Sequence, residues 1–270
     1  MTTTLRTAFE KARAEDRSAL VGYCPAGFPS FDGGIAAMRA MVEGGADVVE
    51  VGLPYSDPLM DGPTIQDAVN HALRGGTRTA DVLRTVEAVA DTGAATVVMT
   101  YWNPVEQYGA ERFARDLTAA GGVGVITPDL ALEEAGPWLE AAAAHHVDPV
   151  LLVAPSSTDA RIAAVTRACR GFVYAASTMG VTGTREQVGD RAQGLVAQVR
   201  RHTDLPVAVG LGVRDAAQAA EVAGFADGVI VGSALVRLLL DAGDETEGTR
   251  GVRTLAGELA EGVRERLVGR

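Results

Sequence analysis

Short apolar runs recur from one end of the chain to the other, and they constrain its fold more than any other feature. They are rich in β-branched residues and are bounded by Gly, Pro or Asp, as expected for strands buried on both faces of a parallel sheet. The runs occupy residues 19–25, 46–54, 95–102, 122–129, 148–155, 171–177, 206–213 and 228–236.

The segments between these runs have the periodicity of helices. Two examples are "IAAMRAMVEGG" (35–45) and "TRTADVLRTVEAVADTG" (77–93), in which apolar residues recur every three or four positions. Strands that alternate with helices in this way predict an α/β fold, the closed (β/α)8 TIM barrel, here with an extra N-terminal helix before the first strand. The segment 242–250 is expected to be a solvated loop, and we predict a single barrel domain spanning residues 1–270.

The composition narrows the classes of partner. A net charge of −11 argues against a nucleic-acid partner and against an anionic membrane surface. No apolar run approaches the roughly 20 residues of a membrane span, and the charged start lacks the apolar segment of a secretory signal, so a cytoplasmic protein is expected. Cys24 and Cys169 are too few for a disulfide framework and are predicted to be reduced, buried thiols.

Chemistry in such barrels gathers at the C-terminal ends of the strands, and the second run has a carboxylate there. Glu50 lies among valines in "VVEVGLPYSDPLMDGPTIQ" (48–66). Burial should raise its pKa, so that it can donate and accept a proton near neutral pH. The alternative is a structural carboxylate satisfied by a neighbouring hydroxyl. Asp61 follows on a Pro-rich loop that can fold over the barrel mouth, and two carboxylates in different surroundings can share one reaction.

The last two strand ends predict an anion site. "GLGV" (210–213) and "VGSA" (231–234) place glycines where a backbone must come close to a ligand, and Ser233 can open a short helix whose amides face an anion. The loops after the seventh and eighth strands are the usual phosphate site of this architecture. The alternative is that these glycines only make tight turns.

Other catalytic groups are scarce at the strand ends. The single lysine, Lys11, belongs to the N-terminal helix, so no strand-end lysine can form a Schiff base or anchor pyridoxal phosphate. The histidines occur in helical stretches or at helix ends, so no metal site is predicted; they are His71, His145, His146 and His202. Carboxylates and tyrosines therefore remain for proton transfer.

The segment "VEVGLPYSDPLMDGPTIQ" resembles the signature of the tryptophan synthase alpha chain family. Further motifs follow in the family's order along the whole chain: "MTYWNP" (99–104), "PDLALEE" (128–134), "GVTG" (180–183), "GLGV" (210–213) and "VGSALV" (231–236). The resemblance implies a lyase of tryptophan biosynthesis that cleaves indole-3-glycerol phosphate to indole and glyceraldehyde 3-phosphate.

The resemblance also implies roles for single residues. Glu50 matches the family's general acid/base, and Asp61 matches the carboxylate that holds the indole N–H. Thr182 is expected to hydrogen-bond Asp61 when two loops, 54–64 and 178–186, close over the site. The other implied substrate-binding residues are Tyr23, Tyr101, Tyr174, Gly183, Gly212, Gly232 and Ser233.

The implied cofactor and partner follow from the same family. No cofactor is expected in this chain, and pyridoxal phosphate is expected only in a partner, the tryptophan synthase beta chain, in an alpha2-beta2 heterotetramer. The chain departs from the family pattern at Ala131, in the segment implied to contact the beta chain, and at Met60, Thr178 and Met179 in the two loops. Two other functions stay open: a stand-alone lyase that releases free indole, and a non-catalytic phosphate-binding barrel.

The expected reaction suits the residues present. A retro-aldol cleavage needs an electron sink, and the indole ring supplies one when its carbon C3 is protonated and N1 becomes iminium-like. Glu50 can serve as acid and then as base, while an ionised Asp61 stabilises the positive charge that develops at N1.

Overall fold

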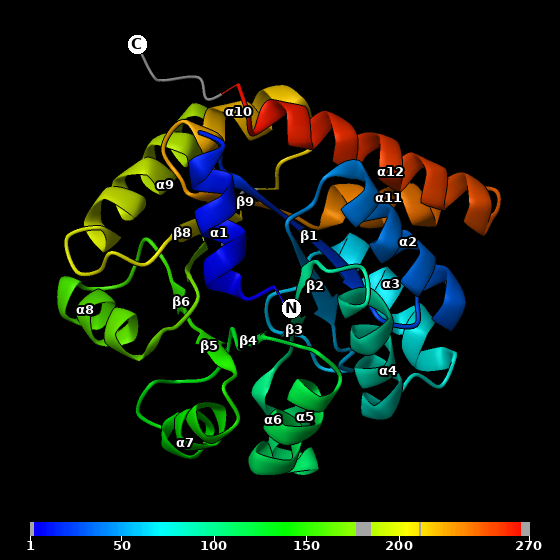
Figure 1. The fold of residues 1–270 in the computed structure, drawn as a ribbon, viewed down its shortest axis with the longest axis horizontal. Helices are drawn as coiled ribbons and strands as arrows, with labels where there is room; N and C mark the ends of the chain where they lie inside the picture. Colours follow the sequence, from blue (N-terminus) through cyan, green and yellow to red (C-terminus); the bar gives the residue numbers. More distant parts are fainter. Residues whose placement is uncertain (1–2, 177–184, 211, 266–270) are drawn as a thin grey trace.

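Each predicted run contains a strand in the computed structural model, which describes residues 3–176, 185–210 and 212–265. All strand pairs are parallel, and the strands surround a common axis (Figure 1). The strands are β1 (Ala19–Pro25), β2 (Val48–Gly52), β3 (Ala95–Met99), β4 (Gly124–Ile126), β5 (Asp148–Val150), β6 (Leu152–Val153), β7 (Val173–Ala176), β8 (Val207–Gly210) and β9 (Gly228–Val231).

The barrel closes through one interrupted strand. Its order is β5-β4-β3-β2-β1-β9-β8-β7-β6, so the two edge strands are consecutive pieces of the predicted run 148–155. They are separated at Leu151, whose N–H donates to Cys169 Sγ at 3.2 Å instead of to a neighbouring strand. β5 pairs with β4 and β6 pairs with β7, which completes the circle. The prediction of a TIM barrel is confirmed.

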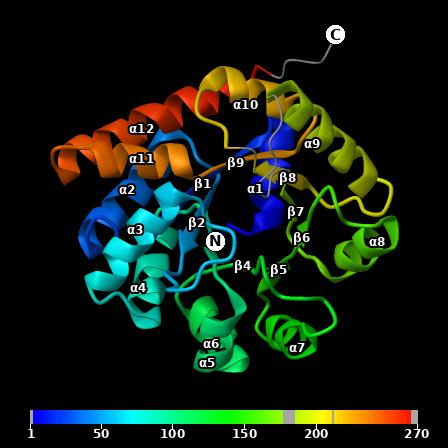
Figure 2. The same ribbon diagram turned by 180° about the vertical axis from the view of Figure 1, so that it is seen from behind.

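Apart from α1, which lies across one end of the barrel, the described helices surround the strands (Figures 1 and 2). One prediction was wrong in part: residues 242–244 form a loop, but 245–250 are helical. Asp244 accepts a hydrogen bond from Glu247 N at 2.8 Å and caps a long helix that begins at Glu245. The helices are α1 (Leu5–Ala14), α2 (Phe31–Gly44), α3 (Pro63–Arg74), α4 (Thr79–Ala90), α5 (Trp102–Tyr108), α6 (Ala110–Ala119), α7 (Gly136–Ala144), α8 (Asp159–Ala168), α9 (Arg185–Val199), α10 (Ala216–Ala223), α11 (Ser233–Asp241) and α12 (Glu245–Gly262).

The extra N-terminal helix, α1, closes the end of the barrel at which the strands begin. Its buried Leu5 and Phe9 belong to the same apolar cluster as the inward-facing strand residues. Glycines make room for both side chains: a Cβ on Gly171 would lie 2.5 Å from Leu5 Cδ1, and one on Gly228 would lie 2.9 Å from Phe9 Cε1. This end of the barrel is therefore filled, and any ligand has to enter from the other end.

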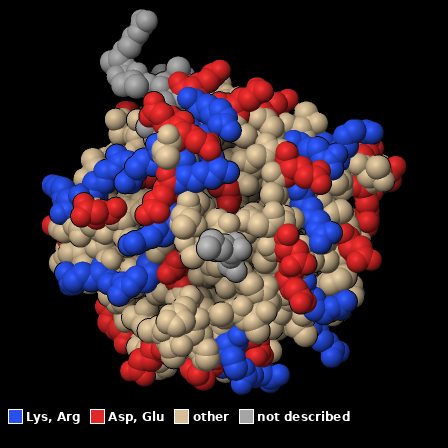
Figure 3. Space-filling model, viewed as in Figure 1, with Lys and Arg blue, Asp and Glu red and all other residues tan. Residues whose placement is uncertain are grey.

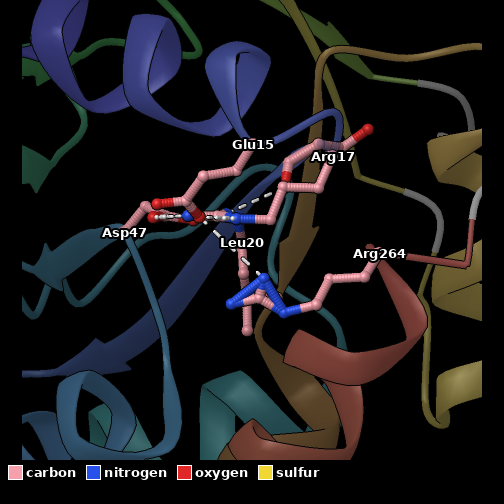
Figure 4. Close-up of polar contacts among 6 residues, drawn as sticks. Glu15, Arg17, Leu20, Asp47 and Arg264 are labelled. Carbon is pink, nitrogen blue, oxygen red and sulfur yellow. Dashed lines mark hydrogen bonds and ion pairs between the residues drawn. The ribbon is translucent and has the colours of Figure 1, made fainter.

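A buried ion pair joins two turns at the same end of the molecule (Figure 4). Arg17 Nη1 and Nη2 donate to the two carboxylate oxygens of Asp47 at 2.6 and 2.8 Å, and Leu20 N donates to Asp47 Oδ2 at 2.9 Å. Arg17 Nε also donates to Glu15 Oε2 at 2.7 Å. The hydrogen bond to Asp47 is the main reason that the pKa of the Arg17 guanidinium is raised. The ion pair therefore joins the turn that precedes β1 to the turn that precedes β2.

The outer surface carries charges of both signs, interspersed around the face that α1 covers (Figure 3). None of the helices in the described part of the chain is long and apolar enough to cross a membrane. Cys24 and Cys169 are buried free thiols, as predicted, and burial raises the pKa of each to about 12.

We predict that Arg17→Ala lowers the free energy of unfolding by about 3–5 kcal/mol, because it leaves the Asp47 carboxylate buried without its partner. The side chains of Arg17 and Asp47 are only 4% and 7% exposed. Equilibrium unfolding in urea measures the change. Arg201→Ala, which removes an exposed ion pair with Asp159, serves as the control and should cost at most about 1 kcal/mol. Equal losses in the two variants would contradict a special role for the buried pair.

Candidate active site

Figure 2 views the barrel from the end opposite α1, where the strands end. A cavity of about 690 Å³ lies at this end. The cavity brings together predicted site residues that are far apart in the sequence. Those that line it are Tyr23, Glu50, Asp61, Tyr174, Gly212, Gly232 and Ser233.

Glu50 is fixed by the strand that carries it. In β2, Val49 and Val51 pack in the cluster between strands and helices, whereas Val48 packs in the inner cluster with α1. Because side chains alternate along a strand, Glu50 shares the inward face with Val48. It is 2% exposed, and its Oε1 has no hydrogen-bond partner among the residues that the structure describes. This finding argues against the alternative of a structural carboxylate satisfied by a hydroxyl.

Burial raises the pKa of Glu50 from 4.5 to about 8. A protonated carboxyl group is the less costly form in such a site, because an isolated carboxylate loses its hydration without compensation. Near neutral pH the group therefore holds a proton that it can give up. This is the property required of a general acid that later acts as a base.

The same pKa shift predicts how stability depends on pH. Between pH 4.5 and about 8 the folded protein keeps the Glu50 proton that the unfolded chain releases. The free energy of unfolding should therefore fall with rising pH in this window, by at most about 1.4 kcal/mol per pH unit, and the loss should be complete above the folded-state pKa. In Glu50→Gln this contribution should be absent. Urea unfolding of both proteins across the window measures the difference, and parallel curves would contradict the raised pKa.

Asp61 lies on the loop between β2 and α3 and is held by side chains rather than by a strand. Tyr101 Oη donates to Asp61 Oδ1 at 3.1 Å, and Gln66 Nε2 donates to the Asp61 carbonyl oxygen at 2.7 Å. Burial raises the pKa of Asp61, and the Tyr101 hydrogen bond opposes that rise. The two carboxyl groups of the cavity thus have different surroundings, as predicted.

Tyr101 is the residue that positions this loop. It is 5% exposed and precedes the first turn of α5, whose Trp102 N donates to Asp129 Oδ1 at 2.9 Å. Its hydroxyl accepts from Met60 N at 3.0 Å, and its ring lies 5.4 Å from that of Tyr55. Burial raises the pKa of Tyr101 to about 12. Tyr101 therefore stands behind Asp61 and is not among the residues that border the cavity.

Tyr174, in β7, lies on the opposite side of the barrel from Asp61. Its hydroxyl occupies space that a side chain at Gly210 would need, since a Cβ there would lie 2.6 Å from Tyr174 Oη. Burial, and then the charge of Glu50, raise the pKa of this phenol. The hydroxyl therefore remains protonated near neutral pH.

The predicted anion site combines a helix N-terminus with glycines. Gly232 precedes α11, which begins at Ser233 without a side-chain cap. The first backbone N–H groups of α11 are therefore available to donate hydrogen bonds to an anion. Gly212 has φ +68°, and a Cβ there would meet open space. Its backbone conformation, and not a close contact within the described residues, is thus what favours glycine at this position.

Two predicted residues, Thr182 and Gly183, lie outside the described residues, as do Thr178 and Met179. The sequence motifs did not reveal the apolar wall of the cavity, which is formed by Leu59, Met60, Ile65, Met99, Leu152, Ala176 and Ile230. Alternation along the strands could have found Met99, since it follows the inward-facing Val97 by two positions. Leu59 is 76% exposed on its loop and follows no such pattern. In the described part of the chain, no cluster of His, Cys, Asp and Glu is arranged to hold a metal ion.

The open end of this barrel carries a buried carboxyl group with a pKa of about 8, one oxygen of which has no hydrogen-bond partner among the described residues. Such a site falls in the class of TIM-barrel enzymes that work by acid–base chemistry. Comparison with protein families narrows this class. The model of the family described as "Tryptophan synthase alpha chain" matches residues 9–264. The chain belongs to the tryptophan synthase alpha chain family, as its motifs predicted.

Individual relatives agree with this assignment. The tryptophan synthase alpha chain of Streptomyces avermitilis is 64% identical over 254 residues, which cover 94% of this chain and 92% of that one. The crystal structure of tryptophan synthase from M. tuberculosis in an open form has a chain with a TM-score of 0.89 and 54% identity, covering 98% of this chain and 100% of that chain. Tryptophan synthase subunit alpha from Legionella pneumophila has a TM-score of 0.88 at 30% identity, with 96% and 97% covered.

Proposed function

We propose that this chain is the alpha subunit of tryptophan synthase. It cleaves indole-3-glycerol phosphate, a small-molecule substrate, to indole and glyceraldehyde 3-phosphate, a carbon–carbon lyase reaction of tryptophan biosynthesis. The observation that carries the proposal is the buried carboxyl group of Glu50, which borders the cavity with an unpaired oxygen and a pKa of about 8. Membership of the alpha chain family supports it.

Cleavage begins with a proton transfer to the indole ring. In its protonated form Glu50 gives its proton to C3, and the ring becomes an iminium at N1. Asp61 accepts the N1–H hydrogen bond, and its negative charge stabilises the positive charge that forms there. The hydrogen bond from Tyr101 favours the ionised form of Asp61 that this role requires.

Glu50, now a carboxylate, next acts as the base. It takes the proton from the hydroxyl group on the carbon attached to C3, and that carbon becomes the aldehyde of glyceraldehyde 3-phosphate. The electron pair of the broken carbon–carbon bond returns to the ring and neutralises the iminium. Glu50 ends the cycle protonated, so the step needs no other proton donor.

Substrate binding is assigned to the two ends of the cavity. The phosphate is held by main-chain N–H groups around Gly212, Gly232 and Ser233, at the N-terminus of α11, and by Gly183. Tyr174 lines the space for the indole ring, and Tyr101 acts on that ring through Asp61. Thr182, which lies outside the described residues, is assigned a hydrogen bond to Asp61 by the family resemblance alone.

The proposed partner is a tryptophan synthase beta chain, in an alpha2-beta2 heterotetramer in the cytoplasm. Pyridoxal phosphate belongs to that partner, and this chain needs no cofactor for the cleavage. Membership of the family and the likeness to chains of tryptophan synthase structures support the pairing. We also propose that residues 1–270 are one domain, since the described helices surround a single barrel.

The experiment that tests the function is cleavage of indole-3-glycerol phosphate by the purified chain, with and without a beta chain. Slow turnover alone and strong activation by the beta chain are expected of the subunit. Efficient turnover by the chain alone would support the stand-alone lyase instead. Binding of the substrate without turnover in either case would leave the phosphate-binding barrel.

Glu50→Gln should lower kcat for this cleavage by at least ~10²-fold, because an amide cannot cycle a proton. Substrate affinity should change little, since the indole and phosphate contacts remain. Steady-state kinetics in the presence of the beta chain measures both. Glu87→Gln, the same change on the exposed side of α4, is the matched control and should leave kcat unchanged. A Glu50→Gln enzyme with most of its kcat would remove Glu50 from the mechanism.

Asp61→Asn should also lower kcat, by roughly 10²-fold or more, because an amide oxygen accepts the N1–H bond without offsetting the positive charge. The same kinetic assay measures the loss. Asp67→Asn, on the exposed face of α3, is the control. Similar rates for the Asp61→Asn variant and the wild-type enzyme would show that the charge of Asp61 has no part in cleavage.

A further inference from the structure

We infer that Tyr23 is a specificity-determining residue whose hydroxyl group hydrogen-bonds the glycerol chain of the substrate. The inference deepens the proposed function and rests on it. It assigns to this phenol a contact with the hydroxyl-bearing part of the ligand, between the phosphate and the indole ring.

The first observation is the position of the phenol oxygen relative to Glu50. Tyr23 in β1 is paired in register with Glu50 in β2. Gly52 lies two residues beyond Glu50 and therefore on the same, inward face of that strand. A Cβ on Gly52 would lie 2.5 Å from Tyr23 Oη, so the hydroxyl group fills the place of the missing side chain. The hydroxyl thus lies directly above Glu50, on the side of the barrel mouth.

The second observation is the position of the other end of the ring. A Cβ on Gly232 would lie 3.3 Å from Tyr23 Cδ1 and 3.5 Å from Tyr23 Cβ. Gly232 is the residue that precedes α11 and its proposed phosphate site. The ring of Tyr23 therefore extends from the phosphate end of the cavity to the layer above Glu50, and glycines at both ends leave room for it.

The third observation is that two polar groups face the cavity without partners. Tyr23 Oη has no hydrogen bond to any of the described residues, and Glu50 Oε1 has none either. Burial first, and then the charges of neighbouring groups such as Asp61, raise the pKa of Tyr23 well above 10. The phenol therefore stays protonated and can donate. Tyr23 is partly buried, whereas Glu50 Oε1 is fully buried, where an unpaired polar atom is costly. A ligand that bonds both groups would pair the buried carboxyl oxygen and the phenol that opens onto the same cavity.

The chemistry of the substrate indicates which part meets Tyr23. Its phosphate is assigned to α11 and its indole N–H to Asp61, so the hydroxyl-bearing carbons lie between them. The base role of Glu50 requires one of these hydroxyl groups to lie beside its carboxylate. The hydroxyl group of Tyr23, directly above Glu50, then orients the glycerol chain by donating a hydrogen bond to it. A site built in this way discriminates against a ligand that lacks the hydroxyl groups.

The test compares two ligands that differ in the glycerol hydroxyl groups alone. Indole-3-glycerol phosphate is the substrate, and indole-3-propanol phosphate keeps the ring and the phosphate but has no hydroxyl on the carbons between them. Tyr23→Phe removes only the phenol oxygen. In the complex with the beta chain, we expect kcat/KM for the substrate to fall about tenfold, the size of one hydrogen bond. The inhibition constant of indole-3-propanol phosphate should stay within about twofold of the wild-type value.

The control is Tyr108→Phe, which removes a phenol hydroxyl that donates to Asp116 outside the cavity and should change neither constant. Unchanged binding of indole-3-propanol phosphate also shows that the cavity of the Tyr23→Phe variant is folded. An unchanged kcat/KM for the substrate would overturn the inference. Equal weakening of both ligands would overturn it too, since Tyr23 would then act through Asp61 or the ring. A wild-type complex that does not cleave the substrate would refute the proposed function itself, and the inference with it.

Discussion

The site depends on the desolvation of one carboxyl group. Closing a parallel sheet into a barrel buries β2 on both faces, and Glu50 goes with it into the interior. An ionised carboxylate at that position lowers the stability of the folded protein, because it loses its hydration. No described residue compensates Oε1 with a hydrogen bond. The same loss of hydration is what places the pKa of Glu50 at about 8. The burial that suits Glu50 to its proposed role as acid and base is therefore also what makes its ionised form unfavourable for folding.

The two ends of the barrel divide stability from function. At the end that α1 covers, Leu5 and Phe9 fill the space above glycines, and the charges of Arg17 and Asp47 are paired. At the other end, polar groups of Tyr23 and Glu50 face a cavity without partners among the described residues. A well-packed end with a paired buried arginine and aspartate can compensate for desolvation at the other end, which is the usual arrangement in this fold.

Much of this could be predicted from the sequence because strand periodicity and strand ends are local signals. The apolar runs marked the strands, and a carboxylate among valines marked Glu50. The interruption between β5 and β6 at Leu151 could not be predicted. It depends on Cys169, at the C-terminal end of α8, whose Sγ accepts the hydrogen bond from Leu151 N–H. The position of Tyr101 behind Asp61 could not be predicted either. That position depends on how α5 and the β2–α3 loop lie against each other in space. The family motif identified Tyr101 as a site residue but did not show that it lies behind Asp61.

The two carboxyl groups of the site are supported in different ways, and this difference suits their proposed roles. Glu50 belongs to a strand paired on both sides, so its distance from the barrel axis is fixed before any ligand arrives. Asp61 belongs to a loop, and the hydrogen bond from Tyr101 occupies one of its oxygens. A carboxylate accepts several hydrogen bonds, so an indole N–H can be added without displacing Tyr101. In the proposed mechanism, the group that moves protons therefore lies on a strand paired on both sides, whereas the group that meets the ring lies on a loop.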